Sequence, residues 1–328
     1  MLAAVISRPG GPEVLDLRTV IRPSPESNEV LIRVRASALN RADLLQRQGH
    51  YPAPPGVPAD IPGMEFAGEV AQIGSNVHLW KPGDRVMGLV AGGAHAEYLV
   101  AHERTLMQIP SSLTWQQAAA VPEAFITAHD ALWIQAALHP SERVLIHAVG
   151  SGVGIAAVQL AKALGSIPFG TSRTPGKLIR AKEFGLESGF LVPGSPAGEE
   201  GRKWAADGPF DIVLDLAGGP YPNASLHALA HRGRIILIGT MAGARSALDL
   251  GLMLGKRARM IGTVLRARPL EEKISVTRLF AREVVPLFER KTLRVVIDTE
   301  FNLSEIRKAH ERMESNETFG KIVLRMSD

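Results

Sequence analysis

Three small residues at fixed spacing, Gly152, Gly154 and Ala157, give the clearest indication of chemistry in this chain. They follow a short apolar run at 144–146 and open a stretch in which apolar residues recur at helical spacing as far as Gly165. In a strand–turn–helix unit, such glycines let the backbone approach a pyrophosphate, and the new helix points its free N–H groups at the phosphates. The pattern predicts a dinucleotide site, and the alternative is a glycine-rich turn with no ligand. The residues expected at the phosphates are Gly150, Ser151, Gly152, Val153 and Gly154.

The segment after the next predicted strand indicates which dinucleotide fits. An NAD site usually carries an acidic residue about 20 positions beyond the glycines, to bind the ribose 2′-hydroxyl. This chain has Ser172, Arg173 and Lys177 there, and the first carboxylate is that of Glu183. Two cations and a hydroxyl suit a 2′-phosphate, so the sequence predicts NADPH. The alternative interpretation of these residues is a solvated basic loop that begins a helix.

Composition limits the class of protein. A chain of 328 residues with 45% hydrophobic residues is long enough for two domains, and it contains no low-complexity tract. The absence of cysteine excludes disulfides, thiolate nucleophiles and thiolate metal sites. No apolar run is long enough to span a bilayer and no signal peptide is recognisable, so a cytoplasmic location is expected. A net charge of +4 spread along the chain suits an anionic cofactor better than a nucleic-acid surface.

The arrangement of predicted elements divides the chain near residue 122. The part before it is rich in strand-like runs separated by Gly and Pro, and the part after it alternates strands with helices, which predicts a doubly wound parallel sheet of the α/β class. The final run, 320–325, is expected to return to the first domain. The predicted strands are 30–34, 66–73, 85–90, 96–100, 144–148, 167–171, 211–216, 234–239 and 260–265.

Several motifs along the whole chain carry a resemblance to a known family. The chain resembles the zinc-free quinone oxidoreductases of the medium-chain dehydrogenase/reductase superfamily, and within them it is most similar to the tumour-suppressor-inducible group. The resemblance implies a GroES-like catalytic domain at 1–122, completed by 267–328, and a Rossmann domain at 123–266 that binds NADPH, with the active site in the cleft between them. The motifs are 8–13, 37–43, 47–51, 62–68, 117–123, 147–154 and 320–324.

The same resemblance places Asn40 and Met64 where zinc-dependent relatives have cysteine and histidine ligands, so no metal is expected. A replacement site built from Asp43, Glu65 and His95 has no spacing that fixes its geometry, and hydrogen-bonding roles behind Asn40 are preferred for the two carboxylates. Without a metal as Lewis acid, alcohol oxidation is disfavoured, whereas quinones and conjugated enals or enones can accept hydride directly.

Resemblance also assigns the site residues. Asn40 and Tyr51 are implied as the catalytic, substrate-side residues, although Tyr51 could instead pack on the prolines around it. Thr127 is implied at the nicotinamide ribose, although a helix threonine can also bond its own backbone. One departure concerns Val192, which stands where relatives carry a tyrosine near the 2′-phosphate, and Arg173 is expected to compensate. The implied cofactor contacts outside the glycine turn and the basic segment are Asn40, Thr127, Gly239, Thr240, Met241, Leu265, Arg266 and Asn316.

Two classes of function therefore remain at this stage. The first is an NADPH-dependent reductase of quinones, free of metal and flavin, with conjugated enals or enones as alternative substrates. The second is an NADPH-binding regulatory protein of weak activity, and RNA binding is disfavoured by an aromatic content of 5%. The apolar strand expected at 259–265 would expose a sheet edge, which relatives cover by pairing it across a two-fold axis, so a homodimer is expected.

Overall fold

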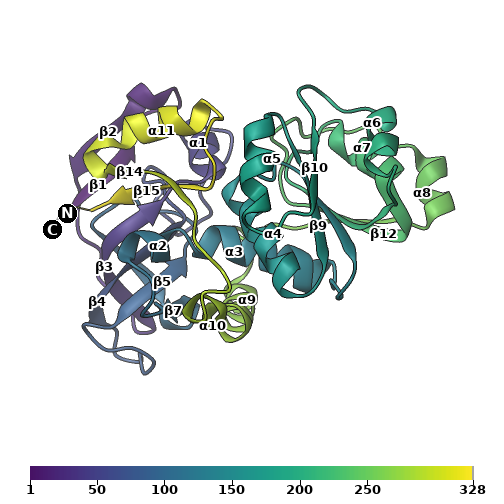
Figure 1. The fold of residues 1–328 in the computed structure, drawn as a ribbon. Coiled ribbons are helices and arrows are strands. Elements are labelled where there is room, and N and C mark those ends of the chain that lie inside the picture. The colour runs from purple at the N-terminus through teal and green to yellow at the C-terminus, as the bar shows by residue number, and fades with distance from the viewer. Residues whose placement is uncertain (327–328) are drawn as a thin grey trace. The chain divides into compact units, whose positions relative to one another are not determined.

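The computed structural model describes residues 1–326 and contains two compact units. Unit 1 consists of Met1–Ile126 and the chain from Leu265 onward, and unit 2 is the continuous stretch Thr127–Val264. In Figure 1 the purple elements of the N-terminal region and the yellow elements of the C-terminal region belong to the same unit, unit 1. Within residues 1–326, no helix is both long enough and apolar enough to cross a membrane.

Unit 2 is built on one parallel sheet of six strands in the order β10-β9-β8-β11-β12-β13. The central strands are apolar and buried, as a parallel sheet covered on both faces requires. This confirms the predicted parallel sheet, although β10 was not among the predicted strands. The strands are β8 (Arg143–Ile146), β9 (Ile167–Ser172), β10 (Ser188–Leu191), β11 (Phe210–Asp215), β12 (Leu229–Leu237) and β13 (Arg259–Gly262).

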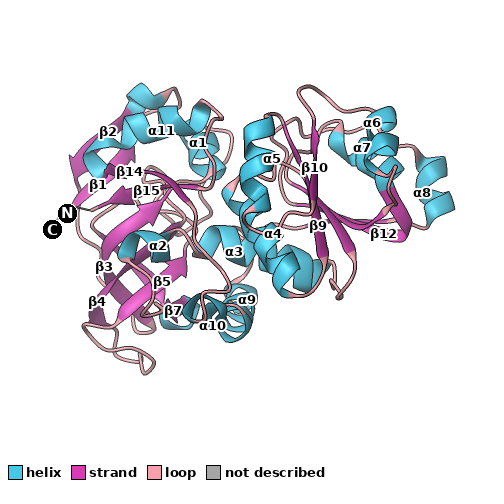
Figure 2. Ribbon diagram, in the orientation of Figure 1, coloured by secondary structure: helices cyan, strands magenta, loops and turns pink. Residues whose placement is uncertain are grey.

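The direction of the chain through this sheet reverses beside β8. The chain runs from β8 outward to β10, then returns to β11 on the other side of β8 and continues to β13. Right-handed crossovers in opposite directions place helices on opposite faces, and Figure 2 shows helices on both sides of the sheet. The carboxyl ends of β8 and β11 therefore border the position at which open α/β sheets bind ligands. The helices are α4 (Gly152–Ala163), α5 (Pro175–Lys182), α6 (Gly198–Trp204), α7 (Tyr221–Ala228) and α8 (Leu250–Lys256).

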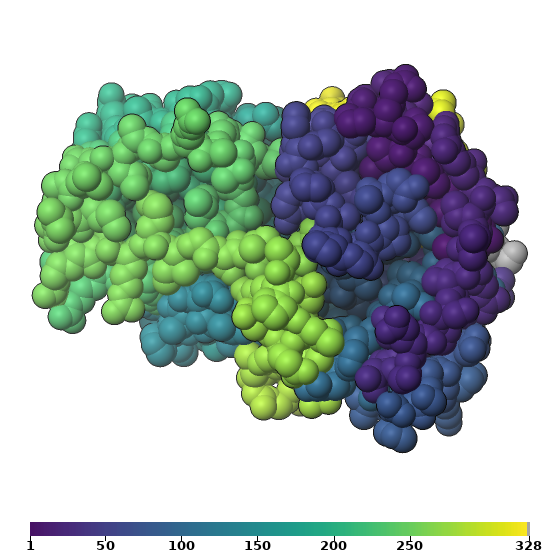
Figure 3. Space-filling view, turned by 180° about the vertical axis from the view of Figure 1, so that it is seen from behind, coloured from purple at the N-terminus to yellow at the C-terminus, as the bar shows by residue number. Residues whose placement is uncertain are grey.

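The last strand of unit 2 is shorter than predicted. The sequence indicated a strand at 260–265, whereas β13 ends at Gly262, and Leu265 and Arg266 lie in the turn that follows. Arg266 donates hydrogen bonds to Gln46, Tyr51 and Ala91, all of unit 1, and these contacts replace continuation of the strand. Light-green segments, which include α8 and β13, form much of the face of unit 2 seen in Figure 3.

Unit 1 contains a larger sheet of seven strands, in the order β14-β15-β3-β4-β5-β7 with β6 paired to β3, and a separate pair, β1 and β2. As expected, the run near the end of the chain joins this unit, because β15 pairs antiparallel with β3. The strands are β1 (Leu2–Ile6), β2 (Leu15–Thr19), β3 (Glu29–Ala38), β4 (Glu65–Ile73), β5 (Arg85–Leu89), β6 (Tyr98–His102), β7 (Leu106–Gln108), β14 (Ile297–Asn302) and β15 (Lys321–Arg325).

Apolar residues from these strands form the core of unit 1 together with one face of α11, including Ile306, Ala309 and Met313. This packing holds the end of β3, the start of β4 and the start of β15 in fixed positions, and the polar cluster described below is built there. The helices of the unit are α1 (Arg41–Arg47), α2 (Trp115–Ala119), α3 (Pro122–His129, which continues into unit 2), α9 (Leu270–Glu283), α10 (Val285–Glu289) and α11 (Ile306–Glu314).

Candidate functional site

The glycine turn lies between β8 and α4, as its pattern predicts. Ser151 caps α4, because its Oγ accepts a hydrogen bond from the N–H of Gly154 at 3.0 Å. A Cβ atom on Gly154 would lie 2.6 Å from the carbonyl oxygen of Ala148, so only glycine fits at this position. The turn is tied to β9 by the Val149 N–H, which donates to Thr171 O at 3.0 Å. The first N–H groups of α4 are thereby directed outward from the end of β8.

The basic segment lies next to this turn. Ser172 is the last residue of β9, and its Oγ accepts a hydrogen bond from Thr174 N at 3.2 Å. The aliphatic part of Lys177, in the first turn of α5, covers Gly150 so closely that a Cβ there would lie 2.7 Å from Lys177 Cδ. Arg173 is exposed between them. The structure thus brings Ser172 and Lys177 to the glycine turn, and this charge and donor set fits an anionic phosphate.

Val192, the position at which the sequence departs from the resemblance, is adjacent to Ser172. Its N–H donates to Ser172 O at 2.8 Å, and its side chain is buried in the core of unit 2. The position therefore supplies no polar side-chain group next to Ser172. Arg173 and Lys177 are the charged side chains predicted for the phosphate pocket, and Arg173 is the more exposed of the two.

Two loops at the carboxyl end of the sheet are held together by backbone hydrogen bonds. Ala242 N donates to Ala217 O at 2.7 Å, and Gly219 N donates to Gly243 O at 2.8 Å. The predicted contact residues 239–241 lie in the second of these loops, and 240 and 241 are exposed. All three are therefore at the same end of the sheet as the glycine turn.

Asp215, which the sequence analysis missed, supports the first of these loops. Its Oδ1 accepts the N–H groups of Ala217 at 2.7 Å and Gly218 at 2.9 Å, whereas its buried Oδ2 has no hydrogen-bond partner. Burial raises the pKa of Asp215 to about 6, although the two amides oppose the shift. An acidic residue at the end of an apolar strand is the only signal that the sequence offered.

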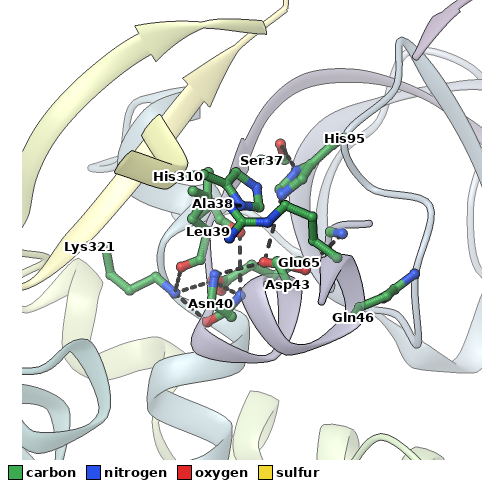
Figure 4. Close-up of polar contacts among 12 residues, drawn as sticks. Ser37, Ala38, Leu39, Asn40, Asp43, Gln46, Glu65, His95, His310 and Lys321 are labelled. Atoms are coloured by element: carbon green, nitrogen blue, oxygen red, sulfur yellow. Dashed lines mark hydrogen bonds and ion pairs between the residues drawn. The ribbon is translucent and has the colours of Figure 1, made fainter. Parts of the chain in front are cut away.

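In unit 1 the amide of Asn40 is held in one orientation (Figure 4). Its Nδ2 donates to Glu65 Oε1 at 3.0 Å and to Ala38 O at 3.3 Å, and its Oδ1 accepts from Lys321 Nζ at 2.6 Å. Because an ammonium only donates and a carboxylate only accepts, the two ends of the amide cannot be exchanged. Both amide hydrogens are engaged within unit 1, and the residue is 5% exposed. Asn40 therefore has no N–H to offer a ligand in this arrangement.

The carboxylate of Asp43 lies behind Asn40, as the sequence analysis preferred. Its Oδ2 accepts the Asn40 N–H at 2.7 Å, and its Oδ1 accepts the Gly63 N–H at 2.9 Å. His95 Nε2 lies 3.7 Å from Oδ2, and His95 Nδ1 is 2.9 Å from Ser37 Oγ. Burial raises the pKa of Asp43, but the His95 ring and the Asn40 N–H together move it below its ordinary value. Ser37, His95 and Asp43 are fully buried, which excludes a nucleophilic role for this serine.

A lysine and two glutamates complete the cluster. Lys321 Nζ lies 2.5 Å from Glu65 Oε1 and donates to Leu39 O at 2.8 Å, in addition to its bond to Asn40. Glu65 Oε2 accepts the Glu123 N–H at 2.8 Å. Burial raises the pKa of Glu65, and the Lys321 ammonium opposes this. Neither Lys321 nor Glu123 was predicted as a site residue, and the signal for Lys321 was its position as a charged residue at the start of the apolar strand β15.

The Tyr51 ring packs on Arg266. The guanidinium carbon of Arg266 lies 4.7 Å from the centre of the Tyr51 ring, and its Nη1 donates to Tyr51 O at 3.2 Å. The remaining Arg266 donors reach Ala91 O at 2.7 Å and Gln46 Oε1 at 2.6 Å. Partial burial raises the pKa of the Tyr51 hydroxyl, with Arg266 lowering it and Glu123 raising it. The hydroxyl therefore stays protonated and can donate a hydrogen bond.

The remaining predicted residues are dispersed. Thr127 lies in α3 at the start of unit 2 and is partly exposed. Asn316 has a left-handed backbone conformation with φ of +61°, and its side chain binds Arg41 and the carbonyl of Glu314. Asn316 is thereby attached to Arg41, the residue that follows Asn40. Leu265 is partly exposed in the turn before Arg266.

A zinc ion does not fit these residues. Among residues 1–326, no group of three or more His, Cys, Asp or Glu side chains has a geometry that could hold a metal ion. At Asn40 the oxygen that could serve as a ligand is bound to the Lys321 ammonium, which also neutralises Glu65. A second cation at these oxygens would be repelled by the first.

Comparisons with known proteins agree with this architecture. A family model described as the alcohol dehydrogenase GroES-like domain matches residues 26–111, and one described as zinc-binding dehydrogenase matches residues 195–324. The quinone oxidoreductase of Pseudomonas aeruginosa is 33% identical over 96% of each chain, and that of Homo sapiens is 30% identical over 96% of this chain and 94% of its own. The crystal structure of Escherichia coli quinone oxidoreductase complexed with NADPH superposes with a TM-score of 0.88 at 28% identity, covering 99% of this chain and 100% of that one.

Proposed function

Because the chain belongs to the medium-chain dehydrogenase/reductase superfamily, as a relative of its quinone oxidoreductases, we propose that it reduces quinones with NADPH, without a metal or a flavin. The chain is an oxidoreductase, and NADPH is its cofactor. The quinone substrate is the part of this proposal that rests on resemblance and on the chemistry of the site.

The contact of Lys177 with the glycine turn carries the proposal. The aliphatic part of Lys177 lies against Gly150, just before the N-terminus of α4, and this supports a site in which its ammonium and the Ser172 hydroxyl would hold the additional phosphate of the dinucleotide. We assign NADPH binding to unit 2, through residues 150–154, Ser172, Arg173 and Lys177, with 239–241 at the carboxyl end of the sheet. We assign the substrate-side residues, Asn40 and Tyr51, to unit 1.

Different residues of the chain then have different roles in the reduction. When bound, NADPH supplies a hydride. Tyr51 offers a protonated hydroxyl and an aromatic face to a planar carbonyl substrate, and Arg266 holds its ring and backbone in place. Asn40 acts as a positioning residue, since its amide links Glu65 to Lys321 and its N–H binds Asp43. A conjugated enal or enone could use the same hydroxyl at its carbonyl oxygen.

The test is NADPH oxidation by the full chain against ortho-quinones, para-quinones and conjugated enals, with oxygen uptake recorded. Turnover of quinones supports the proposal, and oxygen uptake during turnover would indicate release of a semiquinone by single-electron transfer. Turnover of enals alone would replace the quinone with the alternative substrate. Tight NADPH binding with no acceptor turned over would contradict the proposal and favour a regulatory protein.

We also propose a homodimer formed through β13. This strand is at the edge of the sheet of unit 2 and carries Met260 and Ile261, while Leu250 and Leu254 of the neighbouring helix α8 are 66% and 78% exposed. A second copy would cover this apolar edge across a two-fold axis. Ile261→Lys should convert the dimer to a monomer in light scattering after size exclusion. A wild-type monomer, or an unchanged dimer in the variant, would overturn the assignment.

A further inference from the structure

His147 is the first residue after β8, and its buried ring joins three elements of unit 2. Its Nδ1 lies 3.0 Å from Thr171 Oγ1, in β9, and its Nε2 lies 2.8 Å from Ser225 Oγ, in α7. All three side chains are at most 1% exposed. Burial lowers the pKa of His147 to about 3, so the ring is neutral at neutral pH, and both of its nitrogens are engaged. His147 therefore does not contact a phosphate itself.

Thr171 holds the glycine turn on both sides of a strained residue. Ala148 has a left-handed backbone conformation with φ of +50°, which an alanine adopts only at a cost in free energy. The Thr171 hydroxyl bonds the ring of His147, which precedes Ala148. The Thr171 carbonyl oxygen accepts the N–H of Val149, which follows Ala148, at 3.0 Å. Two attachments on either side of a residue fix its orientation, whereas one attachment would leave a pivot, so the turn is held in one orientation at the end of β9.

The orientation of Ala148 in turn sets the start of α4. Its carbonyl oxygen accepts the Ser151 N–H at 2.9 Å, and it is the atom that a Cβ on Gly154 would meet at 2.6 Å. On the other side, Thr171 is followed directly by Ser172, which is assigned to the 2′-phosphate. Thr171 thus joins the two parts of the proposed NADPH site, namely the glycine turn, which any dinucleotide would use, and the basic segment, which only NADPH would use.

We propose that His147 is a positioning residue for cofactor specificity, which supports the preference for NADPH over NADH by holding the glycine turn in a fixed position relative to Ser172. The inference rests on the assignment of NADPH to the glycine turn, Ser172 and Lys177 in the proposed function. NADH lacks the 2′-phosphate and needs only the turn, which the Val149 N–H would still attach to β9. NADPH must contact the turn and the basic segment at once, so its affinity depends on how the two are placed. Loss of the bond between His147 and Thr171 should therefore weaken NADPH binding selectively.

The experiment compares two variants of the full chain that each remove one hydroxyl from the same imidazole. Thr171→Val removes the link to β9, whereas Ser225→Ala removes only the link to α7 and is the matched control. In equilibrium titration, Thr171→Val should bind NADPH about tenfold more weakly, the loss expected for one hydrogen bond, and NADH within about twofold of the wild type. His147→Phe, which keeps a ring and removes both bonds, should show the same selective loss. The ratio of the two affinities should be unchanged in Ser225→Ala and in Thr171→Ser, which keeps the hydroxyl.

A second readout uses only the adenosine half of the cofactor. Thr171→Val should weaken the binding of 2′,5′-ADP, which carries the 2′-phosphate, about tenfold and leave the binding of ADP, which lacks it, nearly unchanged. Equal losses for NADPH and NADH, or the same change of their ratio in Ser225→Ala as in Thr171→Val, would refute the inference and assign His147 to packing alone. A wild-type chain without preference for NADPH would overturn it together with the assignment of Ser172 and Lys177. Selective NADPH binding without turnover of any quinone would instead defeat the proposed reductase function and leave the inference intact.

Discussion

Replacing Lys321 with methionine tests how the buried polar cluster around Asn40 is stabilised. The substitution keeps most of the side-chain volume and removes an ammonium that contacts Glu65 at 2.5 Å, Asn40 at 2.6 Å and Leu39 at 2.8 Å. Removing one partner of a buried ion pair destabilises a protein by about 3–5 kcal/mol, because the other charge is left buried. Glu65 would keep the N–H groups of Asn40 and Glu123 as donors. We therefore expect a loss near the lower limit, about 3 kcal/mol.

The loss should depend on pH. Lys321 opposes the upward pKa shift that burial imposes on Glu65, so its removal raises that pKa further. A carboxyl whose pKa is raised in the folded state destabilises the fold increasingly as pH rises from its unfolded value toward its folded value. Lys321→Met should thus be more destabilising at pH 8 than at pH 5, and the additional Glu65→Gln substitution should remove this difference.

The assay is urea denaturation followed by tryptophan fluorescence, with Lys321→Met, Glu65→Gln and the double variant compared in a cycle. The double variant should be less destabilised than the sum of the single variants by about 2 kcal/mol. Lys308→Met is the control, since Lys308 pairs with Glu305 at 3.1 Å in an exposed position and should contribute less than about 1 kcal/mol. A loss in Lys321→Met no greater than in Lys308→Met, or the same loss at both pH values, would refute the reasoning.

Three further predictions concern unit 2. Lys177→Ala should weaken NADPH binding about ten- to a hundredfold in equilibrium titration, because a charge-assisted bond to phosphate contributes about 1.5–3 kcal/mol. NADH binding should be nearly unchanged, and an equal loss of affinity for both cofactors would assign Lys177 to folding. Gly154→Ala should weaken NADPH binding by at least about tenfold, because its Cβ would meet backbone at 2.6 Å, whereas Gly176→Ala, with open space, should not. The pKa of Asp215 is raised from 3.8 to about 6, so the destabilising effect of its charge should develop as pH rises through this interval. Asp215→Asn should therefore exceed the wild type in unfolding free energy at pH 7, by at most about 3 kcal/mol. An Asp215→Asn variant that is less stable than the wild type by similar amounts at pH 7 and pH 4 would contradict this reasoning.

The parallel sheet and the glycine turn could be predicted from the sequence because both depend on neighbours in the chain. Apolar runs, a glycine triplet and a helical repeat specify β8, the turn and α4 locally. The length of β13 could not be predicted, because the contacts of Arg266 with Gln46, Tyr51 and Ala91 involve residues about two hundred positions away. Resemblance assigned Asn40 to the substrate side, but it could not give the orientation of its amide, which follows from Lys321, brought beside it by the pairing of β15 with β3.

The pairing of β15 with β3 also bears on the order in which the chain can fold during synthesis. Unit 2 is contiguous, Thr127–Val264, and can close its sheet as soon as β13 has left the ribosome. Unit 1 is interrupted by that entire unit, and the partner that neutralises Glu65 arrives only with Lys321. Until then a buried arrangement of Glu65 would lack its counter-charge, so the nascent first half of unit 1 should remain open, with its carboxylate hydrated, and close around the last strand.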